Sequence, residues 1–134
     1  MSVSRVEIRN VAGTQAAMGW AEGHTLIIDR PEGRAGGMGL GFNGAQLLGL
    51  TIGGCFANDI RYVAAELGVT VGEISISVAV ALEGTPIRAV GADMQVSVTL
   101  ADGSDPAKLI EKAKEVSMAM NSLARGLPVS LVAS

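Results

Sequence analysis

The side chain best suited to covalent chemistry in this sequence is its single cysteine, Cys55. An unperturbed thiol is only a few per cent thiolate at neutral pH. The predicted helix around Cys55 gives little help, because its N-terminus is distant and Asp59, one turn later, disfavours the thiolate. A reactive Cys55 therefore needs a nearby cation, for which the candidates are Arg9, Arg30, Arg34 and Arg61. The alternative is an inert thiol packed in the core.

Other residues offer less chemistry. Ser117 lies on the apolar stripe of a second predicted helix, where a hydroxyl commonly bonds back to the carbonyl four residues earlier. His24 has no partner at ligand spacing, so we expect neither a metal site nor a cofactor. The glycine-rich segment 31–41 is not followed by Gly-Lys-Ser/Thr, and Gly-x-Ser-x-Gly is absent. A phosphate loop and a hydrolase nucleophile elbow are therefore not indicated.

The composition excludes several classes of partner. The net charge is -3 and only 3% of residues are aromatic, so a nucleic-acid surface is not expected. Residues 35–58 carry no charge but contain eight glycines, which favours a buried helix over a membrane span. The first ten residues lack the apolar run of a secretory signal. One cysteine allows no internal disulfide and fits a reducing, cytoplasmic setting.

The 134 residues suit a single domain, 1–134, whose first half predicts a sheet and a long helix. Alternating apolar residues predict three short strands at 5–9, 15–20 and 25–29, joined as an antiparallel meander. A glycine-rich linker, 31–41, follows them. Asn43 then caps a helix over Gly44–Leu67 that ends at Gly68.

The second half predicts a hairpin, a helix and a strand. Strands at 74–82 and 94–100 flank a turn at 84–91, and a second helix begins at Asp105-Pro106 and stops at Gly126. Residues 128–133 then add a strand to the second sheet. The fold class is α+β, in the order βββ-α-ββ-α-β.

The first helix is apolar nearly all round, and it contains four glycines that favour close approach of another backbone. We therefore expect a homodimer to bury this helix from both sides.

Two segments carry a resemblance to a known family. Residues 36–48 read Gly-Gly-Met-Gly-Leu-Gly-Phe-Asn-Gly-Ala-Gln-Leu-Leu, and residues 53–56 read Gly-Gly-Cys-Phe. This pattern resembles the OsmC/Ohr family of osmotically inducible and organic hydroperoxide resistance proteins, and the order of elements agrees over nearly the whole chain. The resemblance implies an intertwined α+β homodimer with thiol sites at the subunit interface. It also implies that Cys55 is the peroxidatic cysteine, with Phe56 and Asn43 as substrate-binding candidates.

The departures from the family pattern concern the rest of the site. Ala45 stands where the family has a glutamate, and the family's arginine has no clear counterpart, which leaves Arg9 or Arg34 to stabilise the thiolate. Ser117 occupies the position of the resolving cysteine, with Asn121 kept. A sulfenic acid on Cys55 would then need an external thiol for reduction.

Three functions follow as hypotheses. The first is a one-cysteine hydroperoxide reductase acting on small hydroperoxides in oxidative-stress defence. The second is a non-catalytic protein that binds a small apolar molecule or lipid and has lost the peroxidase chemistry. The third is a dimeric scaffold for a protein partner.

Overall fold

The computed structural model describes residues 1–133. The chain divides into two compact units, Met1–Leu47 and the part that begins at Leu48. Each unit has its own sheet: three strands in the first and two in the second.

The first unit is an antiparallel meander, as the alternating pattern predicts. Strands β1 (Glu7–Asn10), β2 (Ala17–Ala21) and β3 (His24–Ile28) pair in sequence order. Gly19 of β2 lies between Ile8 and Leu26 in the register. After β3 the glycine-rich segment folds back, and Phe42 forms a parallel bridge with Ile28.

Helix α1 (Gly44–Leu67) begins in the first unit and continues into the second. Its N-terminus is a reciprocal capping box. The Gln46 backbone N–H donates to Asn43 Oδ1 at 2.9 Å, and the Asn43 backbone N–H donates to Gln46 Oε1 at 2.9 Å. Gly68, at φ +69, terminates the helix. The predicted bounds and the capping role of Asn43 are confirmed.

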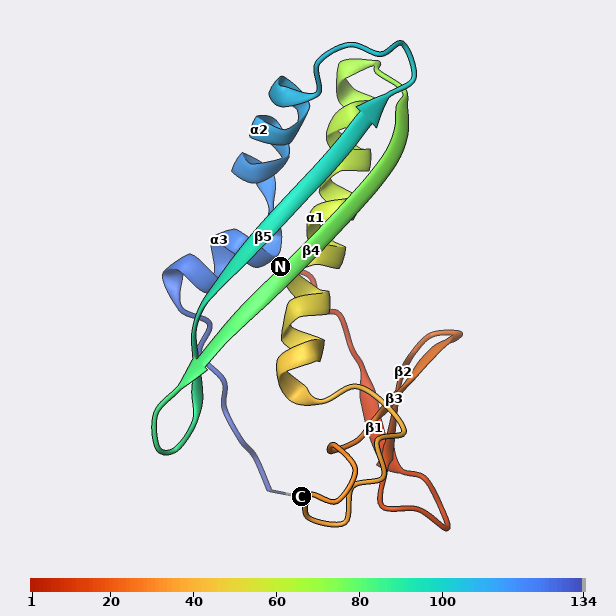
Figure 1. Cartoon of the computed structure of the whole chain (residues 1–134), viewed down its shortest axis with the longest axis vertical. Helices are drawn as coiled ribbons and strands as arrows, with labels where there is room; N and C mark the ends of the chain where they lie inside the picture. Colours follow the sequence, from red (N-terminus) through yellow and green to blue (C-terminus); the bar gives the residue numbers. More distant parts are fainter. Residues whose placement is uncertain (134) are drawn as a thin grey trace. The chain divides into compact units, whose positions relative to one another are not determined.

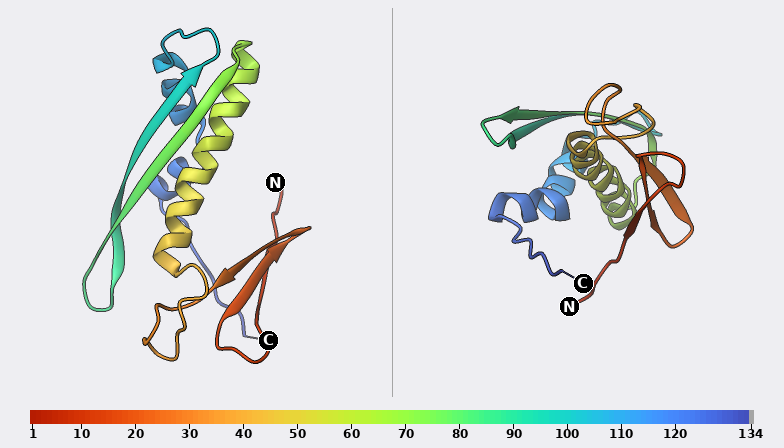
Figure 2. Two further views of the ribbon diagram at one scale, coloured as in Figure 1. Left: turned by 45° about the vertical axis from the view of Figure 1, so that its right-hand side comes forward. Right: turned by 90° about the horizontal axis from the view of Figure 1, so that it is seen from below.

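The second unit is a long hairpin with helices on one side (Figure 1). Strands β4 (Val71–Glu83) and β5 (Arg88–Leu100) pair antiparallel. Both strands are longer than predicted, because the ladder continues to Glu83 and Arg88 through residues that do not alternate in hydropathy. Figure 2 shows α1 and the two C-terminal helices on the same side of this hairpin.

The core of the second unit joins α1, β5 and the first of those helices. Ile60 of α1 and Ala113 are fully buried, and Val98 of β5 packs in the same cluster. The side of the hairpin that faces the helices is therefore apolar, and it packs against one face of α1 within the second unit. Leu50 is half exposed, so the expected burial of α1 on most sides is not met by a single chain.

Two predictions about the C-terminal region are wrong. The second helix is broken into α2 (Ala107–Val116) and α3 (Met118–Arg125), because Ser117 adopts a non-helical ψ of 115°. The Ser117 hydroxyl accepts from the Met120 N–H at 3.4 Å and caps α3, instead of bonding back to a carbonyl of α2. Gly126, at φ +77, ends α3 as predicted.

The second wrong prediction is the final strand. Residues 128–133 form no strand, and none of the described strands pairs with them. The side chains of Val129, Leu131 and Val132 are each more than 80% exposed. Strand propensity depends on burial and on packing against neighbouring strands, and this β-branched run gains neither.

The four glycines of α1 divide into positions that contact β4 and positions that do not. A Cβ on Gly53 would lie 2.9 Å from Val78 Cγ2 and 3.3 Å from Ile76 Cγ2, whereas one on Gly54 would meet nothing within 4 Å. The close approach predicted for these glycines is therefore to side chains of β4, and Gly53 is where it is tightest.

These two neighbours make a matched pair of variants. Gly54→Ala should stabilise the protein by up to about 1 kcal/mol, because alanine favours helix over glycine. Gly53→Ala should instead destabilise it, because the stiff Val78 side chain must move away. Urea unfolding measures both, and an equal gain for the two variants would contradict the packing of α1 on β4.

Candidate functional site

Cys55 lies on α1, partly exposed, one helical turn before Asp59. Its thiol donates a hydrogen bond to Asp59 Oδ2 across a sulfur–oxygen distance of 3.6 Å. The i, i+4 spacing places both side chains on the same face of the helix. Cys55 is therefore both accessible to a small molecule and in contact with a carboxylate.

Asp59 is a buried carboxylate, only 8% exposed. Within residues 1–133 the ion pair found joins Arg30 to Asp29, so no described cation is paired with Asp59. The hydrogen-bond partner of the Asp59 carboxylate is therefore the Cys55 thiol and not a positively charged side chain. Sequence reasoning identified Asp59 as a negative neighbour of Cys55 but did not predict the hydrogen bond.

The other positions implied by the resemblance are placed as follows. Ser117 is fully buried at the break between α2 and α3, and Ala45 lies half-buried in the first turn of α1. Arg9 lies on β1 with its guanidinium 5.5 Å from the centre of the Trp20 ring. Arg34 is exposed in the glycine-rich segment. Both arginines belong to the first unit and Cys55 to the second, so their pairing with the thiol stays a prediction.

The glycine-rich segment is an ordered loop held by Asp29, which the sequence pattern did not single out. The buried Asp29 carboxylate accepts from three backbone N–H groups: that of Leu40 at 3.0 Å, that of Met38 at 3.1 Å and that of Arg30 at 2.8 Å. The Arg30 guanidinium lies 3.3 Å from the same carboxylate. The loop therefore folds over the end of β3 and does not behave as a free linker.

These contacts change the acidity of Asp29. The N–H of Leu40, followed by those of Met38 and Arg30 and by the Arg30 charge, holds the pKa of Asp29 below its ordinary value, against an opposing effect of burial. The ionised carboxylate is therefore the form that the folded loop favours.

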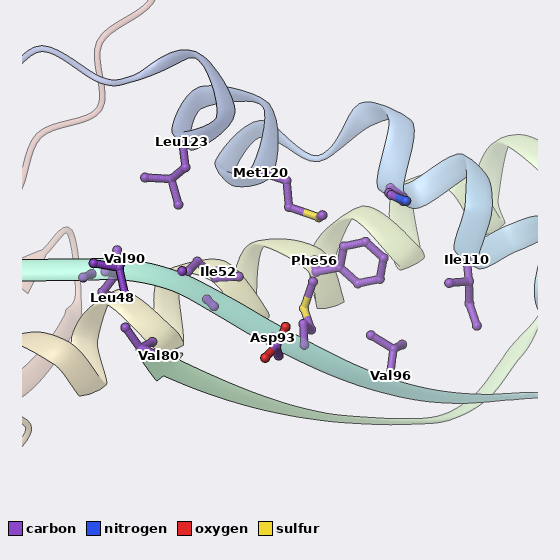
Figure 3. Close-up of a pocket in the computed structure, with 15 residues that line it drawn as sticks. Leu48, Ile52, Phe56, Val80, Val90, Asp93, Val96, Ile110, Met120 and Leu123 are labelled. Atoms are coloured by element: carbon purple, nitrogen blue, oxygen red, sulfur yellow. The ribbon is translucent and has the colours of Figure 1, made fainter. Parts of the chain in front are cut away.

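An apolar pocket of about 760 Å³ lies within the second unit (Figure 3). Its walls come from α1, β4, β5, α2 and α3, and Met120 and Leu123 extend into it from α3. Lys114 and Asp93 are its charged lining residues. Phe56 forms part of the wall, but its neighbour Cys55 does not. The volume falls in the range of small-molecule sites.

Residues 1–133 offer neither a metal-binding cluster nor a membrane-spanning helix. Residues 1–133 contain no group of three histidine, cysteine or acidic side chains that could hold a metal ion. In the same part of the chain no helix has the length and hydropathy to cross a bilayer.

A two-sheet α+β fold with its single cysteine partly exposed on the long helix defines the class of this protein. Residues 36–132 match the OsmC-like protein family, and the chain belongs to that family. No curated protein sequence matches it.

Solved structures show the same fold at low sequence identity. An OsmC-like protein from Mycoplasma pneumoniae is similar with a TM-score of 0.74 at 13% identity, over 94% of this chain and 89% of that one. The organic hydroperoxide resistance protein OsmC of Legionella pneumophila gives 0.62 at 22% identity, over 90% of each chain. An organic hydroperoxide resistance protein of Elizabethkingia anophelis gives 0.62 at 18%, over 94% and 91%. The expected family and α+β fold are confirmed.

The lowered pKa of Asp29 predicts a pH dependence of stability. A carboxyl whose folded pKa is depressed stabilises the protein above its unfolded pKa of about 3.9, and this contribution is lost as pH falls toward the folded value. Asp29→Asn should therefore lower the melting temperature at pH 7 and flatten its fall below pH 4. Glu32→Gln, with the same charge change on an exposed residue of the loop, is the control. Indistinguishable melting curves for the two variants would refute the role of Asp29.

Proposed function

We propose that this protein is a one-cysteine hydroperoxide reductase in which Cys55 is the peroxidatic thiol. The observation that carries the proposal is the position of Cys55, the chain's only cysteine, partly exposed on the long helix of an OsmC-like fold. Two of the similar structures are of organic hydroperoxide resistance proteins, which supports a hydroperoxide as the substrate class.

The reaction has an oxidative and a reductive half. The Cys55 sulfur attacks the terminal oxygen of ROOH, the S–O bond forms as the O–O bond breaks, and the products are a sulfenic acid and the alcohol ROH. Because Ser117 replaces a second cysteine, an external thiol then displaces water from the sulfenic acid to give a mixed disulfide. A second external thiol releases Cys55 and leaves as an external disulfide.

We also assign roles to residues around the thiol. Arg9 or Arg34 is the cation that stabilises the thiolate charge as it develops on the attacking sulfur, and Asn43 and Phe56 contact the substrate. A homodimer covers the exposed face of α1, where Leu50 and Tyr62 lie open in the single chain. The cytoplasm is the compartment whose thiol pool would keep Cys55 reduced.

Removal of the thiol is the direct test. Cys55→Ser should abolish consumption of cumene hydroperoxide in the presence of dithiothreitol, because a hydroxyl is not oxidised by peroxide as a thiolate is. Ser104→Ala, a hydroxyl change in an exposed turn, is the control that should keep the wild-type rate. Equal peroxide consumption by Cys55→Ser and wild type would exclude the proposal.

The apolar pocket favours a second candidate, a protein that binds a small apolar molecule without chemistry. The pocket excludes Cys55 and is walled by Ile52, Phe56 and Val80 among others, so it would hold an apolar ligand without involving the thiol. The scaffold hypothesis has no comparable support.

Filling the pocket tests this candidate. Ala92→Trp should abolish binding of an apolar fluorescent probe such as anilinonaphthalene sulfonate, because Ala92 lines the pocket and an indole would occupy it. Ala79→Trp is the matched control, because Ala79 lies on the neighbouring strand β4 and does not line the pocket. If both variants bind the probe like wild type, the pocket is not the binding site.

A further inference from the structure

The buried Asp59 carboxylate has a contact that neither core packing nor charge balance explains. It is 92% removed from solvent, counting from its 8% exposure, and it lies among the buried apolar residues Phe56 and Ile60 of α1. Burying a carboxylate is costly unless its oxygens are hydrogen-bonded or paired with a cation. In the described structure its side-chain hydrogen bond comes from the Cys55 thiol, and no ion pair involves it.

The contact between the two side chains lies within α1. Residues four apart on a helix are neighbours on its surface, so the helix itself brings Cys55 Sγ and Asp59 Oδ2 within 3.6 Å. The carboxylate is thus fixed beside the atom that would react with a peroxide.

The hydrogen bond points the thiol proton at the carboxylate. Cys55 Sγ is the donor and Asp59 Oδ2 the acceptor, at a separation of 3.6 Å. Attack of this hydrogen-bonded thiol on a hydroperoxide must remove that proton from the sulfur. It must also deliver a proton to the alkoxide that leaves the peroxide.

We propose that Asp59 carries this proton and is a second catalytic residue of the Cys55 site. This inference rests on the proposed hydroperoxide reduction. As the S–O bond forms and the O–O bond breaks, the thiol proton moves to Asp59 Oδ2 and from there to the departing RO⁻. The sulfur is oxidised to the sulfenic acid, the peroxide is reduced to ROH, and Asp59 ends as the carboxylate it was at the start.

The test compares two reactions of the same thiol. In Asp59→Asn the amide oxygen can still accept the thiol hydrogen bond but cannot take the proton, so the rate of Cys55 oxidation by cumene hydroperoxide should fall about 100-fold or more. Alkylation by iodoacetamide releases iodide, which needs no proton, so it runs through thiolate formed beforehand by loss of the proton to water and requires no proton delivery by Asp59. Its rate should stay equal or rise, because the variant removes a negative charge beside the sulfur.

Two further variants separate this role from a structural one. Glu66→Gln, the same change on an exposed residue of α1, should leave both rates at their wild-type values. Asp59→Glu keeps a carboxylate and should recover part of the peroxide reaction. A structural role would slow oxidation and alkylation together, so parallel loss of both rates would overturn the proposal. Oxidation of Asp59→Asn as fast as that of wild type would overturn it too.

A measurement on the unaltered protein keeps the proposal testable if the variant does not fold. A proton in transfer should make peroxide oxidation of Cys55 slower in D2O than in H2O by a larger factor than alkylation. Equal isotope effects for the two reactions would overturn the assignment of Asp59. If wild-type Cys55 is not oxidised at all, the proposed function itself fails, and that result is distinct from a normal oxidation that is insensitive to Asp59.

Discussion

The packing of α1 against the β4–β5 hairpin is the constraint on which the second unit depends. Gly53 is buried against Val78 and Ile76 with no room for a side chain, and Ile60 is completely enclosed in the same layer. Apolar burial of this kind is the dominant favourable term in folding. Because that contact fixes the rotation of α1 about its axis, it also decides which helix residues face the core and which remain accessible.

That rotation places the cysteine and the pocket wall on neighbouring residues of one helix. Ile52 and Phe56 point to the space enclosed by β5 and α3 and form a wall of the pocket (Figure 3). Cys55 and Asp59 lie beside that stripe, outside the pocket lining, with the thiol partly exposed and the carboxylate buried. The proposed thiol chemistry and the proposed apolar binding would therefore use different faces of the same α1.

The parts of the fold that follow from local sequence could be predicted. Asn43, the apolar periodicity and Gly68 gave the bounds of α1 because a cap, a stripe and a stop are all encoded within the helix. The break at Ser117 could not be found in this way, since the apolar stripe continues across it and only tertiary packing shows a buried N-cap. Residues 128–133 have strand-forming side chains, yet they pair with none of the described strands, so composition alone gives the wrong result there. Asp29 and Asp59 gain their roles from hydrogen bonds, which composition and spacing do not reveal.

Whether Cys55 is a peroxide-reactive thiol can be measured by the mass of the intact protein after one equivalent of cumene hydroperoxide. A reactive Cys55 should gain one oxygen atom per chain, located on the peptide that contains Cys55 and removed by an external thiol. An unchanged mass, or oxygen found only on the 6 methionines, would contradict this reactivity.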